Sequence, residues 1–67
     1  MIITLNNQPI EIPEGVNTVS DLMKWKNIPT QGTAIALNDK LLLKKDWDVK
    51  NLEDMMNVTI ISAAFGG

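Results

Sequence analysis

The chain contains neither cysteine nor histidine among its 67 residues. Domains of this length usually rely on disulfides, a bound metal or very regular packing. Without cysteine no disulfide can form, and without cysteine and histidine most metal ligands are missing. A chain this short also cannot divide its apolar residues, 45% of the total, between two cores. The sequence therefore predicts a single domain over residues 1–67 that is held together by regular packing.

The same absence limits the chemistry that the side chains can perform. Without thiol or imidazole groups, the chain lacks the usual nucleophile, the usual proton shuttle near neutral pH and the N/S metal ligands. The carboxylates between Asp46 and Asp54 do not have the spacing of a calcium loop. We therefore expect a protein that is not an enzyme by itself and that holds no metal and no bound cofactor.

The charge and hydropathy patterns exclude two further classes of partner. The net charge is −2, whereas proteins that bind phosphate backbones are usually basic. The longest apolar stretch, residues 58–65, is far shorter than the roughly 20 residues that span a bilayer. Met1 also leads directly into a strand-like pattern rather than a signal peptide. We expect a cytoplasmic protein that binds neither nucleic acid nor membranes.

The first thirteen residues predict a β-hairpin. Residues 1–6 alternate between two sets of side chains, and residues 9–13 place their two isoleucines on one face. Between them, Asn6-Asn7-Gln8 supplies residues that tolerate left-handed backbone conformations. Pro9 lacks an N–H group, which favours an edge position for the second strand.

A short helix follows. Thr18 and Asp21 have the spacing of a helix N-terminus at which the hydroxyl and the carboxylate both accept backbone N–H groups. The helix is predicted to begin near Val19 and to end near residues 26–27, before Pro29. Its apolar face includes Leu22.

The second half predicts another hairpin, an irregular stretch and a final strand. Residues 33–37 and 40–43 flank the turn-forming pair Asn38-Asp39. A single helical turn is expected around residues 46–49. Within the stretch before it, the adjacent cations Lys44 and Lys45 are interpreted as solvated charge, with docking to an acidic partner surface as the alternative. Residues 58–63 form a β-branched strand.

The last strand has no hairpin partner directly before it, so it must pair elsewhere. The simplest place is beside the first strand and parallel to it, with the helix covering one face of the sheet. The predicted fold class is therefore α+β, a β-grasp arrangement in which a mixed sheet of four to five strands packs on one short helix. Leu22 and Ile60 are predicted core residues.

The chain finishes with Ala64, Phe65, Gly66 and Gly67. Two glycines can follow a flat path through a narrow channel, and they leave the terminal carboxylate sterically bare. Transfer of AMP from ATP would convert that carboxylate into a reactive acyl-adenylate. Residues 64–67 are therefore the predicted partner-binding segment, expected to be flexible in the free protein, with Gly67 as the reactive site. Phe65 either anchors the tail in a partner pocket or folds back onto its own sheet.

These features resemble a known family. The segments "ITLNNQ", "TVSDLM", "AIALND" and "AAFGG" are similar to those of the ubiquitin-like sulfur carriers of the ThiS and MoaD superfamily, most closely those of the ThiS type in thiamine biosynthesis. The resemblance implies that an E1-like adenylyltransferase of the ThiF type, using ATP and Mg²⁺, adenylates Gly67. A thiocarboxylate then forms with sulfur from a cysteine desulfurase and is used by a thiazole synthase of the ThiG type.

One departure from the family pattern and two alternatives stand beside this interpretation. Family members often carry a Gly-Asp pair in the turn before the last strand, where this chain has Met55 and Met56. The first alternative is the small subunit of molybdopterin synthase, the MoaD type, which uses the same tail chemistry. The second is a β-grasp module for protein interaction or conjugation.

Overall fold

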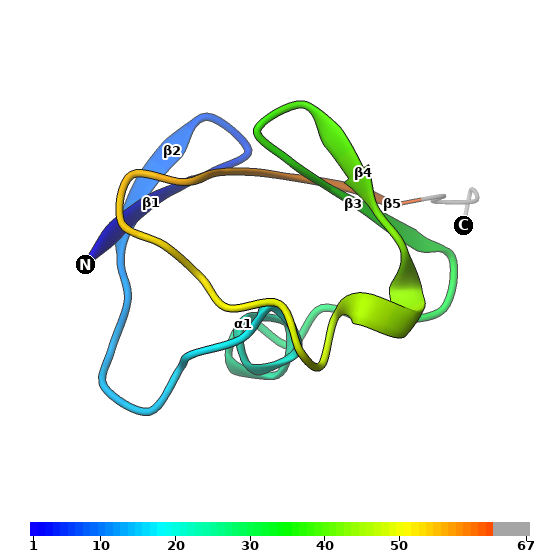
Figure 1. Cartoon of the computed structure of the whole chain (residues 1–67), viewed down its shortest axis with the longest axis horizontal. Coiled ribbons are helices and arrows are strands. Elements are labelled where there is room, and N and C mark those ends of the chain that lie inside the picture. Colours follow the sequence, from blue (N-terminus) through cyan, green and yellow to red (C-terminus); the bar gives the residue numbers. More distant parts are fainter. Residues whose placement is uncertain (63–67) are drawn as a thin grey trace.

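A computed structural model describes residues 1–62 of the chain as a five-stranded sheet and one short helix. The strands are β1 (Ile2–Leu5), β2 (Gln8–Glu11), β3 (Thr33–Leu37), β4 (Lys40–Leu42) and β5 (Asn57–Ser62), and the helices are α1 (Val19–Trp25) and the 3₁₀-helix η1 (Lys44–Asp46). The sheet forms one layer, and α1 lies across from it as the other (Figure 1). The α+β fold class and the β-grasp arrangement are confirmed.

Strand β5 is the central strand of the sheet. The strand order is β2-β1-β5-β3-β4. Thr4 and Leu5 of β1 lie beside Asn57 and Val58 in a parallel register, whereas residues 58–62 of β5 pair with β3 in an antiparallel register. The last strand therefore pairs beside the first, as the sequence predicted, and β2 and β4 are the edges.

Both hairpins turn on two residues with left-handed backbones. The φ angles are 49° and 68° at Asn6 and Asn7, and 49° and 70° at Asn38 and Asp39. Two consecutive positive φ angles are characteristic of the type I′ turn, whose twist suits an antiparallel pair, and Asn and Asp tolerate this conformation. Because the first turn needs only two residues, β2 begins at Gln8, one position earlier than expected.

Helix α1 is fixed at both ends by local hydrogen bonds. At its start, the backbone N–H of Asp21 donates to Thr18 Oγ1 and the N–H of Thr18 donates to Asp21 Oδ2, both at 3.1 Å. At its end, the N–H of Ile28 donates to the Met23 carbonyl at 2.9 Å while Asn27 adopts φ 56°, which is a Schellman ending. The helix has seven residues, and no helix within residues 1–62 is long and apolar enough to cross a membrane.

The hydrophobic core lies between α1 and the sheet. Its fully buried side chains include Val19, Leu22 and Met23 from the helix and Ile3, Ile35 and Val58 from the sheet. Leu22 is thus a core residue as predicted, but Ile60 is only half-buried and packs against the margin of the core. The prediction for Ile60 was wrong in degree because β1 ends opposite Val58, so Ile60 has a neighbouring strand on one side only.

The helical turn in the irregular segment begins two residues earlier than predicted. It spans Lys44–Asp46 and follows directly after β4, and residues 47–49 continue as a hydrogen-bonded turn. The early turn brings Trp47 into the core with 3% of its surface exposed. There its indole Nε1–H donates to the Leu42 carbonyl at 3.3 Å. The expectation of irregular structure after residue 44 is otherwise correct.

Candidate functional site

The predicted reactive segment, Ala64, Phe65, Gly66 and Gly67, lies outside the described residues 1–62. The structure does show where that segment begins. Ser62 is the last residue of β5 and lies opposite Thr33, the first residue of β3. This end of β5 is at the opposite side of the molecule from the N-terminus (Figure 1). The described chain therefore ends in the central strand of the sheet.

Side chains in the two hairpin turns hold β5 from both sides. Asn38 Oδ1 accepts the backbone N–H of Asn57 at 2.9 Å, and the N–H of Asn38 donates to the carbonyl of Asn57 at 2.8 Å. From the other hairpin, Asn6 Oδ1 accepts the N–H of Ile60 at 2.7 Å. The sequence indicates that both asparagines form turns, but it does not indicate that their side chains form hydrogen bonds with β5. The strand that leads to the reactive segment is thus fixed over its described length.

An exposed apolar surface lies on the face of the sheet that points away from α1. Because strand side chains alternate between faces, Ile61 points outward while Val58 and Ile60 point toward the core. Ile61 is 55% exposed, and Leu41 of β4 is 68% exposed. Leu41 pairs with Ala36 and Ile61 pairs with Ala34, so these two apolar side chains share the outer face without being direct cross-strand neighbours. The alternation of β5, with isoleucines on both faces, was the sequence signal for this surface.

A groove adjoins the end of β5 and is called the exit groove here. It has a volume of about 420 Å³ and is lined by Thr30, Gly32, Thr33, Ala34, Lys44 and Ile61. Ala34 lies directly opposite Ile61 in the sheet register. Lys44 comes from η1 and adds a positive charge to walls that are otherwise apolar or hydroxylic. The sequence does not distinguish Lys44 from its neighbour Lys45, and no local pattern indicates that Lys44 lies beside β5.

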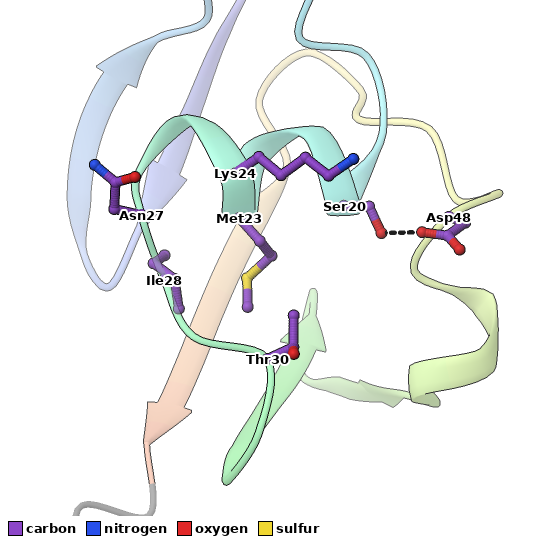
Figure 2. A pocket seen from close by; sticks show the side chains of 7 residues that line it. All are labelled: Ser20, Met23, Lys24, Asn27, Ile28, Thr30 and Asp48. Carbon is purple, nitrogen blue, oxygen red and sulfur yellow. Dashed lines mark hydrogen bonds between the residues drawn. The ribbon is translucent and has the colours of Figure 1, made fainter.

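A second pocket lies on the helix side of the molecule. It is lined by Ser20, Met23, Lys24, Asn27, Ile28, Thr30 and Asp48, as Figure 2 shows. The hydroxyl of Ser20 donates to the carboxylate of Asp48 at the margin of this pocket. None of its lining residues comes from β5. Within residues 1–62 there is also no cluster of three or more acidic, histidine or cysteine side chains that could hold a metal ion.

Asp21 has a lowered pKa because of its position at the start of α1. The backbone N–H groups of Asn17 and Thr18 donate to its carboxylate at 3.0 and 3.1 Å and hold the pKa of Asp21 below its usual value. Hydrogen bonds to the ionised form favour that form. The perturbed carboxylate is therefore part of a helix cap and is not an acid or base for catalysis.

Comparisons with known proteins agree with this architecture. The structure is similar to the crystal structure of the thiamine biosynthesis protein ThiS from Geobacter metallireducens, with a TM-score of 0.83 and 20% sequence identity over 100% of both chains. At that identity the likeness establishes the fold. No curated protein matches the sequence significantly. The profile of the ThiS family matches residues 3–67, a range that includes the terminal Gly66-Gly67. The chain belongs to the ThiS family.

Proposed function

We propose that this protein is the sulfur carrier of thiamine biosynthesis and that the carboxylate of Gly67 carries the sulfur. The observation that supports this role most strongly is the family match, which continues through Gly66 and Gly67 to the end of the chain. A carrier needs an accessible carboxylate on a stable domain, and it needs no catalytic groups of its own. This is consistent with a chain that has no cysteine or histidine.

In the proposed chemistry, the thiocarboxylate forms in three steps outside the carrier's own side chains, and a further enzyme then uses it. An E1-like adenylyltransferase of the ThiF type binds ATP and Mg²⁺, and a Gly67 carboxylate oxygen attacks the α-phosphorus while pyrophosphate leaves. A persulfide charged by a cysteine desulfurase then attacks the acyl carbon, and AMP leaves. Finally a thiol cleaves the S–S bond of the acyl persulfide, which gives the thiocarboxylate and a disulfide. A thiazole synthase of the ThiG type takes the sulfur.

The described residues 1–62 would provide the surface to which these partners bind. The hydrogen bonds from Asn6 and Asn38 fix β5, so a partner that binds the sheet would also hold the point at which the described chain ends. Holding reacting groups in the right geometry lowers the barrier of an otherwise bimolecular reaction. The exposed side chains of Leu41 and Ile61 offer apolar contacts on the outer face of the sheet. We further propose that the carrier works in the cytoplasm without nucleic-acid or membrane partners.

The test follows the intact mass of the purified protein. It is incubated with ATP, Mg²⁺, the E1-like adenylyltransferase of the same organism, a persulfide-charged cysteine desulfurase and a thiol. The mass should rise by the difference between one sulfur and one oxygen atom. Deletion of Gly67 should abolish the change, since the terminus would be one residue short of the adenylation site. Addition of a residue after Gly67 should also abolish it, because the reactive carboxylate would become an amide.

A graded variant and a control complete the test. Gly66→Leu should slow the reaction, because a bulky side chain obstructs a narrow channel without removing the carboxylate. Lys24→Ala, on the helix, should react at nearly the wild-type rate. The proposal is wrong if no sulfur-shifted species forms, or if the extended variant reacts as well as the wild type. A ladder of protein conjugates on denaturing gels would instead favour the conjugation module. Transfer of sulfur to a molybdopterin precursor would favour the MoaD type.

A further inference from the structure

We infer that the exit groove receives an acidic side chain of the adenylating partner and that Lys44 is the residue that recognises its carboxylate. This inference rests on the proposed function, because the partner is the enzyme that activates Gly67. It adds a specific docking point, with a stated chemistry, to the segment that carries the reaction. The position, the shape and the charge of the groove support it.

The position of the groove links it to the reactive segment. Ile61 lines the groove and directly precedes Ser62, the last described residue. Five residues follow Ser62. An extended chain covers at most about 3.3–3.6 Å per residue, so the Gly67 carboxylate can lie at most about 18 Å from the end of β5. A partner that binds at the groove would therefore need its own active site within that distance of the end of β5.

The walls of the groove suit a side chain with an apolar stem. Ala34 and Ile61 face each other across adjacent strands on the outer face of the sheet. Gly32, at φ 71°, contributes backbone without a side chain. Thr33 directs its hydroxyl at the Pro29 carbonyl at 2.6 Å, so this proton is already used within the protein. The methylene groups of a partner side chain can pack against these walls, and its carboxylate can then pair with the ammonium group of Lys44.

The charge of the groove comes from a lysine that has no carboxylate partner within residues 1–62. Lys45, its neighbour, pairs with Asp46 at 3.7 Å, whereas Lys44 lies over the ring of Trp47 at 5.8 Å from the ring centre. A neutral ring does not cancel the charge of Lys44. Because the chain as a whole carries −2, attraction of an acidic group depends on this local cation. A glutamate, with two methylene groups before its carboxylate, fits both features.

The experiment measures adenylation by the rate of pyrophosphate release at varied carrier concentrations. Lys44→Glu should raise the KM for the carrier by about tenfold or more, because like charges would then face each other in the interface. The kcat at saturation should stay close to the wild-type value, since the residue does not touch the reacting atoms. Lys44→Arg, which keeps the positive charge, should have a KM close to that of the wild type. Lys45→Glu is the matched control with the same change in net charge, and it should change KM by no more than about twofold.

A second set of measurements separates recognition from folding. Lys44→Met keeps an apolar side chain of similar length and removes the charge, so it should raise KM and weaken the dependence of KM on salt concentration. Thermal unfolding should show that each variant remains folded. The inference is wrong if Lys44→Glu and Lys45→Glu have equal effects, or if Lys44→Arg fails to restore KM. If the wild-type carrier is adenylated but insensitive to Lys44, only this inference fails, whereas absence of adenylation in the wild type overturns the proposed function and this inference together.

Discussion

The side-chain oxygen of Asn6 accepts the backbone N–H of Ile60 at 2.7 Å, and the backbone N–H of Asn6 donates to the carbonyl of Val58 at 2.9 Å. Strand β1 ends at Leu5, so a backbone partner for β5 is no longer available at this point. The asparagine continues the hydrogen-bond pattern beyond the end of the strand. It therefore combines two roles, since it also forms the hairpin turn with φ 49°.

Replacing each asparagine of this turn by glycine should separate the two roles. Glycine adopts the positive φ angles of both positions without strain. Asn6→Gly should lower the free energy of unfolding by about 1 kcal/mol or more, because the N–H of Ile60 loses its acceptor. Asn7→Gly should change it by only a few tenths of a kcal/mol. Urea unfolding of both variants checks this, and equal effects would show that the bond to Ile60 contributes nothing.

Met55 occupies a left-handed position, with φ 68°, in the turn before β5. Its N–H donates to the Ile2 carbonyl at 2.7 Å, so the turn is attached to β1, and its side chain is 77% exposed. Left-handed backbone costs a residue with a Cβ about 1–2 kcal/mol, and glycine costs about 0.5–1 kcal/mol in chain entropy. Met55→Gly should therefore stabilise the protein slightly, by roughly 0.5 kcal/mol, which denaturant titration can resolve.

Met56 provides the contrast to Met55. It is only 4% exposed and belongs to the core. Met56→Gly should destabilise the protein by about 2–5 kcal/mol or more, because it leaves a cavity and frees the backbone. If the two substitutions had the same sign and size, the assignment of the turn position to Met55 would be wrong.

The helix cap should make stability depend on pH in the acid range. The folded-state pKa of Asp21 is lowered, first by the hydrogen bond from the Asn17 N–H and then by that from Thr18. A lowered pKa means that the ionised cap contributes stability above the unfolded-state value near 3.9, and that this contribution is lost as the pH falls through the folded-state value. The unfolding free energies of wild type and Asp21→Asn should therefore differ at pH 7 and converge as the pH falls below about 4. A constant difference would contradict the charge-dependent cap.

Two core positions should differ in sensitivity. Leu22 is fully buried, and Leu22→Ala should cost about 2–5 kcal/mol, a large part of the stability of a small domain. Ile60 is half-buried at the margin of the core, so Ile60→Ala should cost clearly less. Chemical denaturation of both variants measures the difference. A larger loss at Ile60 than at Leu22 would mean that the described burial of β5 is incorrect.

Local features of the fold could be predicted from the sequence because they depend on residues within a few positions of one another. The Asn6-Asn7 and Asn38-Asp39 turns and the Thr18–Asp21 cap are of this kind. The terminal Gly66-Gly67 also indicates the chemistry of the C-terminus without reference to the fold, and the family match includes both residues. The sequence by itself thus determined the elements, their order and the proposed reactive group.

Relationships between distant residues were decided by the tertiary structure. The bond between Asn6 and Ile60 joins positions 54 residues apart, and the exit groove brings Lys44 next to Ile61. The order of the strands in the sheet brings these distant residues together. The hydrophobic pattern of a single strand does not indicate which strand ends first, and the pattern around residues 44–45 does not indicate which lysine faces a groove. For the same reason, the half-burial of Ile60 depends on the length of β1 rather than on the pattern of β5. Local sequence specifies the conformation of each element, whereas the neighbours of a side chain are set by how all elements pack.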